Sequence, residues 1–214
     1  MPFQYSCFIS YAHGQEQLIR RFIEELEKAL KSSLEPYLDQ KVYIDEDRHK
    51  PGDRFNPKIA RALCQSVCMI LVYVPKYGQH SYCVREYVAM ESLEEQRRAL
   101  LGKKLPAERG FIIPIVLRGR HEDLPPKLKG HIHYADFSRY TTASSDIGST
   151  ADYVKVIDDI ANSVYELYQD LASAEADLCT GCEEFKLPAE GNVKLWQSGG
   201  APPGAPFPLR EPDR

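Results

Sequence analysis

Short apolar runs alternate along this chain with longer stretches of helical period, and this alternation limits the possible folds more than any other feature. Runs with the length and composition of strands lie at residues 6–10, 41–44, 68–74, 110–117 and 131–137. Stretches of helical period lie at residues 18–30, 56–65, 81–101 and 151–172. Strands that alternate with helices indicate βα units, so the sequence predicts an α/β protein with a parallel sheet and helices on both faces.

The pattern stops near residue 173, where the composition changes. Five of the 15 prolines fall in the last thirteen residues, and such a segment has too few backbone donors for regular structure. We therefore expect one domain at residues 1–172 and a disordered, Pro/Gly-rich tail or linker at residues 173–214. This tail could also attach the domain to a larger complex.

Composition and charge exclude several classes of protein. The net charge of −4 provides no basic surface for nucleic acid, so we expect no nucleic-acid partner. No basic segment precedes an apolar run at the N-terminus, and the longest apolar run, at residues 67–74, is too short for a bilayer. Four of the six cysteines lie in apolar or mixed segments, as free thiols often do. These features predict a cytoplasmic protein without a membrane segment.

The two remaining cysteines, Cys179 and Cys182, have the spacing of a metal-binding pair. Structural zinc needs four ligands, and no second pair follows them in the sequence. We therefore interpret them as a solvated thiol pair in the tail and expect no metal site.

A ligand site is expected where three loops meet. In an open parallel α/β sheet, ligands bind beyond the carboxyl ends of the strands. The loops at residues 11–15, 45–54 and 75–80 follow the first three predicted strands and therefore meet at that edge.

The helix after the third loop carries an unusual carboxylate, Glu86. It shares one helical face with Tyr82 and three apolar residues, Ala89, Met90 and Leu93. A carboxylate on an inward face is costly unless it lines a cleft or has polar partners. Two interpretations follow: a functional carboxylate in a cleft, or a capping or partly exposed glutamate that hydrogen-bonds nearby amides.

Three segments in order resemble the TIR (Toll/interleukin-1 receptor) domain family. FISYA at residues 8–12 resembles the first family motif, and VYIDEDRHKPGDRF at residues 42–55 resembles the second strand with its long loop. ILVYVPKYGQHSYCVRE at residues 70–86 resembles the third strand and the S-[WY]-C-x-x-E element. The resemblance implies a flavodoxin-like three-layer fold with a five-stranded parallel sheet. It also implies self-association with other TIR domains and, for the bacterial NAD⁺-cleaving type, a role in anti-phage immunity.

The resemblance also assigns site residues. The glutamate that closes the third motif, Glu86, corresponds to the catalytic residue of NAD⁺-cleaving members. The residues that correspond to the NAD⁺ site are Tyr11, Ala12, His13, Gly52, Phe55 and Tyr82. Two of them differ from the usual pattern, because Tyr82 replaces Trp and Ala12 stands where catalytic members often carry Arg.

The chemistry of NAD⁺ cleavage suits these residues. The nicotinamide–ribose bond breaks through an oxocarbenium-like state that a fixed carboxylate stabilises, and aromatic faces at Tyr82 and Phe55 could sandwich the nicotinamide. NAD⁺ would then be the substrate, with no cofactor, and the product would be ADP-ribose or a cyclic isomer. The alternative is a non-catalytic TIR adaptor that works only by TIR–TIR assembly. A phosphoacceptor receiver domain is excluded, since Pro75 stands where such a domain needs an aspartate.

Overall fold

Five parallel strands form the centre of the protein, which was analysed as a computed structural model. The structure describes residues 3–13, 17–45, 55–119, 124–129, 134–138, 150–173 and 177–196. The strands are β1 (Tyr5–Tyr11), β2 (Lys41–Ile44), β3 (Ser66–Tyr73), β4 (Ile112–Val116) and β5 (Ala135–Asp136). Their order in the sheet is β2-β1-β3-β4-β5, the order of flavodoxin-like folds. The expected five-stranded parallel sheet is confirmed, and β3, central in the sheet, is buried along its whole length.

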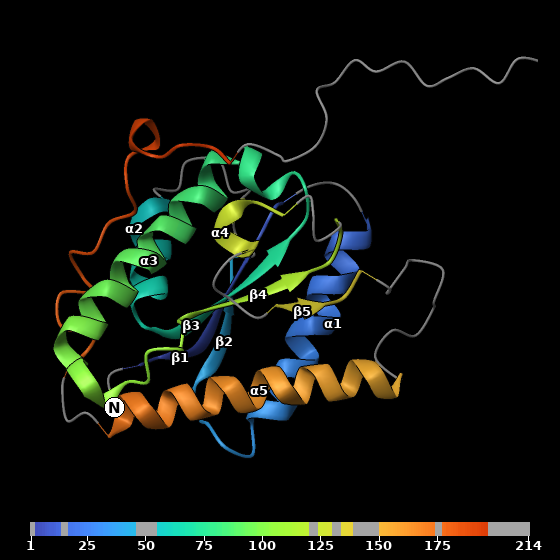
Figure 1. Cartoon of the computed structure of the whole chain (residues 1–214), viewed down its shortest axis with the longest axis horizontal. Coiled ribbons are helices and arrows are strands. Elements are labelled where there is room, and N and C mark those ends of the chain that lie inside the picture. The colour runs from blue at the N-terminus through green and yellow to red at the C-terminus, as the bar shows by residue number, and fades with distance from the viewer. Residues whose placement is uncertain are drawn as a thin grey trace, which may run out of the picture.

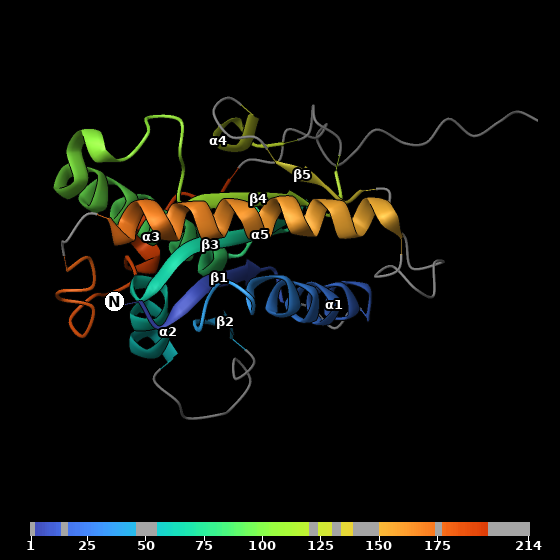
Figure 2. The same cartoon turned by 90° about the horizontal axis from the view of Figure 1, so that it is seen from below.

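Helices cover both faces of this sheet. They are α1 (Gln17–Leu34), α2 (Phe55–Cys64), α3 (Ser81–Leu101), the short α4 (Pro126–Lys129) and α5 (Ala151–Ala172). Helix α1 packs against α5, and α2 packs against α3, on opposite sides of the sheet (Figures 1 and 2). Within the described ranges, no helix combines the length and the apolar character needed to cross a membrane.

Arg97 anchors α3 to the turn between α2 and β3. Its guanidinium is 2% exposed and donates to the carbonyl oxygens of Cys64 at 2.7 Å and Ser66 at 3.1 Å. The same group lies 5.0 Å from the ring centre of Phe3 and 5.5 Å from that of Phe111. Burial lowers the pKa of Arg97 to about 10. The carbonyls and aromatic faces compensate for the lost hydration and keep α3 in register with the sheet.

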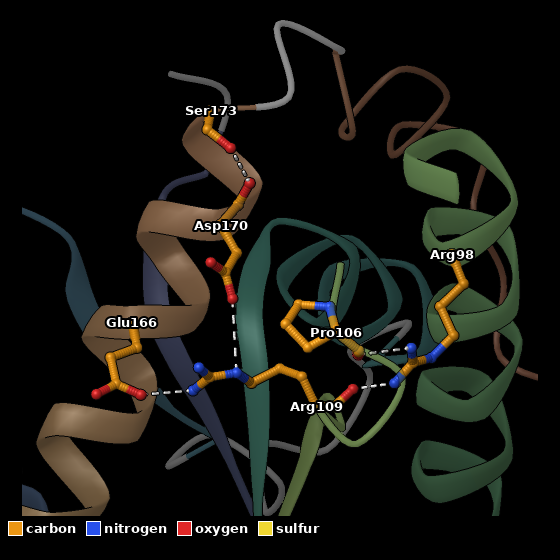
Figure 3. Close-up of polar contacts among 6 residues, drawn as sticks. All are labelled: Arg98, Pro106, Arg109, Glu166, Asp170 and Ser173. Carbon is orange, nitrogen blue, oxygen red and sulfur yellow. Dashed lines mark hydrogen bonds and ion pairs between the residues drawn. The ribbon is translucent and has the colours of Figure 1, made fainter. Parts of the chain in front are cut away.

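A loop between α3 and β4 ties α3 to α5 on the other side of the sheet (Figure 3). Arg98 of α3 donates to the carbonyl oxygens of Pro106, at 3.3 Å, and Arg109. The Arg109 side chain reaches Glu166 at 2.7 Å and Asp170 at 3.5 Å, both on α5. The two helices are therefore held at fixed positions relative to β4.

The C-terminal segment, residues 177–196, differs from the tail that the sequence predicts. Helix α5 ends at Ala172, the predicted boundary, but Leu178, Cys182 and Leu187 beyond it are buried in the core. Cys182 forms a disulfide with Cys64 at the end of α2, so it is not a solvated thiol. Figure 1 shows the segment, in orange-red, running along α2 and α3. Over these residues the predicted tail is part of the packed domain, while residues 197–214 lie outside the described residues.

Candidate functional site

Glu86 is the buried carboxylate at the carboxyl edge of the sheet. It lies on α3, just over one turn from the helix start, and its side chain is 0% exposed. The predicted inward face is confirmed, because Ala89, Met90 and Leu93 are also buried. Interpretation as a partly exposed glutamate is therefore wrong. A buried carboxylate needs polar partners, and the structure places a hydroxyl within reach.

Ser10 supplies that hydroxyl from the end of β1. Its Oγ donates to Glu86 Oε2 at 2.5 Å and lies 2.7 Å from the phenolic oxygen of Tyr77. The Tyr77 hydroxyl also donates to the Cys83 carbonyl oxygen, at 3.3 Å. Ser10, Tyr77 and Glu86 are each 0% exposed. The chain Tyr77–Ser10–Glu86 thus joins three elements in a dry environment, where hydrogen bonds reinforce one another.

The first predicted loop lies beside the start of α3. Tyr11 and His13 are half-buried, and their rings stack with centres 4.1 Å apart, while Ala12 is buried. The Cys83 thiol donates to the Tyr11 carbonyl oxygen at 3.4 Å, which ties this loop to α3. Residues 11–13 therefore lie next to two contacts that connect β1 to α3, the Ser10–Glu86 bond and the Tyr11–Cys83 bond.

Tyr82 and the long second loop complete the predicted set. Tyr82 is half-buried, and the guanidinium of Arg85 lies 5.8 Å from its ring centre. Gly52 lies outside the described residues. Phe55 is the first residue of α2, and its side chain is among those that the structure does not describe. The assignment of all six residues to NAD⁺ binding stays a prediction.

A cavity of about 690 Å³ lies away from these residues. It opens at the amino end of β4, beside Ile112 and Arg109, and includes none of the predicted site residues. Burial, with the nearby Glu91 carboxylate, raises the pKa of its wall residue Tyr87. We do not assign the candidate functional site to this cavity, because its walls carry no fully buried carboxylate comparable to Glu86.

The structure also bears on whether side chains are grouped as metal ligands. In the part of the chain that the structure describes, no group of three or more His, Cys, Asp and Glu side chains could hold a metal ion.

Sequence patterns did not indicate two residues of the Tyr77–Ser10–Glu86 chain. Ser10 lies inside the FISYA motif and Tyr77 inside the loop before α3, but neither was selected. The signal for Ser10 was a small polar residue in an apolar strand. Tyr77 meets Ser10 across 67 residues, so its role depends on the tertiary fold.

Strand order, parallel pairing and a polar site at the carboxyl edge together define a flavodoxin-like α/β protein. The comparisons with known proteins are more specific. The sequence profile of the TIR domain matches residues 7–148, which is more than half of the 214 residues. The chain therefore belongs to the TIR domain family.

Two further comparisons complete this result. None of the curated proteins compared matches the sequence. Among solved structures, the TIR domains of the activated Roq1 resistosome, which directly recognises the pathogen effector XopQ, are similar with a TM-score of 0.41 and 15% identity. That alignment covers 74% of this chain and 84% of the solved chain.

Proposed function

We propose that this TIR domain is an NAD⁺ glycohydrolase in which Glu86 is the catalytic residue. The reaction breaks the nicotinamide–ribose bond and releases nicotinamide with ADP-ribose or a cyclic isomer. We also propose that the domain acts in the cytoplasm, in bacterial anti-phage immunity, after self-association with other TIR domains.

The observation that carries the proposal is the Glu86 carboxylate itself. It closes the S-[WY]-C-x-x-E element, is fully buried and accepts a hydrogen bond from Ser10 at 2.5 Å. Burial of a carboxylate opposes folding, and a chain under selection for stability alone would use an apolar residue there. The presence of a buried carboxylate at this position favours a chemical role.

The chemistry needs little beyond a placed negative charge. The N-glycosidic bond breaks with its electron pair leaving on nicotinamide, which departs neutral, and positive charge develops on the ribose. A fixed carboxylate in a water-poor site stabilises that charge. Water then attacks the anomeric carbon and releases one proton, which gives ADP-ribose; attack by an adenine nitrogen gives a cyclic isomer instead.

Aromatic side chains would hold the substrate in this scheme. Tyr11 and Tyr82 are both half-buried. The Tyr11 carbonyl oxygen accepts a hydrogen bond from Cys83, the residue after Tyr82, so both tyrosines belong to the junction between β1 and α3. Their faces can attract the cationic nicotinamide ring, and Phe55 would cover it from the second loop. Ala12 provides no cation for the phosphates, so His13 is the candidate for that contact.

Access to Glu86 requires a change from the described arrangement. The carboxylate is 0% exposed, so a ribose can reach it only if the surrounding loops move. Contact with a neighbouring TIR domain could hold such an open arrangement, and this links catalysis to assembly in the proposal.

A second candidate function, the non-catalytic TIR adaptor, is favoured by that same burial. A glutamate closed inside a Tyr77–Ser10–Glu86 chain can serve as a structural link between β1 and α3. The two functions differ in one product, because an adaptor releases no nicotinamide from NAD⁺.

The test is incubation of the purified full chain with NAD⁺ at several protein concentrations. We expect nicotinamide release with a specific activity that rises with protein concentration, because the proposal makes catalysis depend on contact with a neighbouring TIR domain. Chromatography of the second product distinguishes ADP-ribose from a cyclic isomer. A constant specific activity over a hundredfold dilution would contradict the dependence on assembly, and absence of nicotinamide at all concentrations would favour the adaptor.

A further inference from the structure

The C-terminal segment is fastened to the face formed by α2 and α3. Cys182 is joined to Cys64 by a disulfide across 118 residues of sequence, with a Cα–Cα distance of 5.5 Å. Leu178 and Leu187 on either side of it are buried in the core. The disulfide is therefore the covalent part of an attachment that otherwise depends on a few apolar side chains.

Polar contacts continue the attachment along the two helices. Glu183 reaches Arg61 of α2 at 2.5 Å. Glu190 accepts from Ser81 of α3 at 2.6 Å, and the Pro188 carbonyl oxygen accepts from Arg85 at 2.5 Å. These groups are exposed or half-buried, and such contacts add little stability on their own.

The end of the segment reaches the loop next to Glu86. The Trp196 amide donates to the Gly78 carbonyl oxygen at 3.0 Å. Its indole lies 5.4 Å from the Tyr77 ring and 4.9 Å from the Tyr87 ring, centre to centre. Tyr77 is the same residue whose hydroxyl bonds Ser10, the donor to Glu86. A continuous set of contacts thus runs from the disulfide to the candidate catalytic carboxylate.

We propose that Cys64–Cys182 is a redox modification site, and that its reduction by a dithiol releases the C-terminal segment from α3 and from Tyr77. One thiolate of the reductant attacks a sulfur of the disulfide, the S–S bond breaks, and the other cysteine leaves as a thiolate that takes up a proton. The second thiol of the reductant resolves the mixed disulfide. The protein gains two thiols and the dithiol becomes a disulfide.

Breaking the disulfide weakens the attachment of the segment. The disulfide holds the segment near α2 at a high effective concentration, and without it the nearest fixed point is the end of α5. What remains are exposed polar contacts and the apolar groups Leu178, Leu187 and Trp196. Both sulfur-bearing residues are at most 3% exposed, so reduction follows local lifting of the segment.

Cys179 provides a matched control within the same turn. Its thiol lies 3.7 Å from the Cys64 carbonyl oxygen, beside the disulfide but outside it. Burial raises the pKa of Cys179 to about 11, so at neutral pH this residue is a thiol and a poor attacking group. Changing Cys179 to serine removes a neighbouring thiol and leaves the disulfide in place.

The consequence for catalysis rests on the proposed function. Trp196 packs on Tyr77, which lies against the Ser10–Glu86 pair, and Glu86 has no exposed surface while the segment is in place. Release of Trp196 frees the loop at residues 75–80 to move and lets a ribose reach the carboxylate. The attached segment is therefore an inhibitory contact, and reduction raises the rate of NAD⁺ cleavage.

Trp196 also makes the test direct, because it is the only tryptophan in the chain. The full chain is prepared without reductant and its emission is followed as dithiothreitol is added, while alkylation and mass spectrometry report which cysteines are free. We expect Cys64 and Cys182 to become alkylated together with a shift of Trp196 emission to longer wavelength. Cys179→Ser should respond as the parent does, whereas Cys64→Ser should show the shifted emission without reductant.

A second variant keeps every cysteine, so it tests the proposal even if Cys64→Ser does not fold. A Cβ at position 78 would lie 2.5 Å from the Trp196 Cβ, so Gly78→Ala displaces the indole with the disulfide intact. Its emission should be shifted in the oxidised protein. Unchanged emission after full reduction would overturn the proposal, and so would six free thiols in the protein prepared without reductant.

Nicotinamide release, measured in the same samples, separates this inference from the proposed function. Faster release after reduction, and from Gly78→Ala, supports the inhibitory contact. Shifted emission with equal rates before and after reduction overturns the link to Glu86. Shifted emission with no nicotinamide from any sample supports the redox site at Cys64–Cys182 but contradicts NAD⁺ cleavage, the proposed function.

Discussion

The Ser10 hydroxyl donates to the Glu86 carboxylate at 2.5 Å. Ser10→Ala removes that donor and one partner of the Tyr77 hydroxyl, which keeps its bond to the Cys83 carbonyl oxygen. We expect a loss of about 1–3 kcal/mol in the free energy of unfolding, since buried groups lose a partner. We also expect a roughly tenfold fall in the rate of nicotinamide release, because the carboxylate is less well oriented.

Ser6→Ala is the matched control for that change. Ser6 lies on the same strand and is equally buried, at 0% exposed, but four residues further from the carboxyl edge. Its rate of nicotinamide release should stay within about twofold of the parent. Equal rates for Ser10→Ala and Ser6→Ala would show that Ser10 does not orient Glu86.

Single residues also show what the sequence could and could not predict. The burial of Glu86 follows from helical period, which needs only its neighbours on α3. The hydroxyls of Ser10 and Tyr77 come from elements far apart in the chain, so their meeting depends on how β1 and β3 pair. Local patterns therefore predicted the carboxylate but not its partners.

At the scale of elements, regular segments were predicted well. The observed bounds of α3 and β2, Ser81–Leu101 and Lys41–Ile44, are those expected from the sequence, since periodic apolar residues mark such segments clearly. The C-terminal segment has no regular period. Its buried residues Leu178, Cys182 and Leu187 are spaced by four and five positions among polar residues, so its packing could not be predicted.

Truncation tests the contribution of this segment to stability. A chain that ends at Ala172 loses the disulfide and the buried leucines, whereas a chain that ends at Trp196 keeps both. A disulfide contributes about 2–4 kcal/mol, so we expect the first truncation to lower the thermal midpoint by on the order of 5–15 °C under non-reducing conditions. The second should stay within about 3 °C of the parent. Similar midpoints for the two truncated chains, measured by circular dichroism, would contradict the packing of the segment.

At the scale of the whole molecule, buried thiols make stability depend on alkaline pH. Burial raises the pKa of Cys7 to about 12, and burial together with Cys7 raises the pKa of Cys68 well above its usual value of 9.0. Unfolded thiols lose their protons near pH 9, while the folded ones keep theirs. The folded state then binds more protons, so stability is full below pH 9 and falls as pH rises above it.

The expected loss is on the order of 2–3 kcal/mol between pH 8.5 and 10, from denaturant unfolding without reductant. Arg97 acts in the opposite direction above pH 10, because its pKa in the folded state is lowered to about 10. The window from pH 9 to 10 is therefore the informative one. Cys68 and the half-buried Cys179 also have raised pKa values, so Cys7→Ala should reduce the slope by roughly a third to a half. An unchanged slope would show that Cys7 does not contribute.

The catalytic role proposed for Glu86 is tested by nicotinamide release from Glu86→Gln. The change keeps the shape and most of the hydrogen-bonding capacity of the side chain but removes its negative charge. Loss of the charge that faces the ribose should cost about 3 kcal/mol or more, which is at least roughly a hundredfold in rate. Stability should hardly fall, because a buried carboxylate becomes a neutral amide.

Glu95→Gln makes the same charge change on the exposed side of α3 and should retain the parent rate within about twofold. Both variants are compared with the parent at one protein concentration, with folding checked by circular dichroism. We expect a roughly hundredfold loss for Glu86→Gln alone. Nicotinamide release by folded Glu86→Gln within a few-fold of the parent would contradict the catalytic role of Glu86.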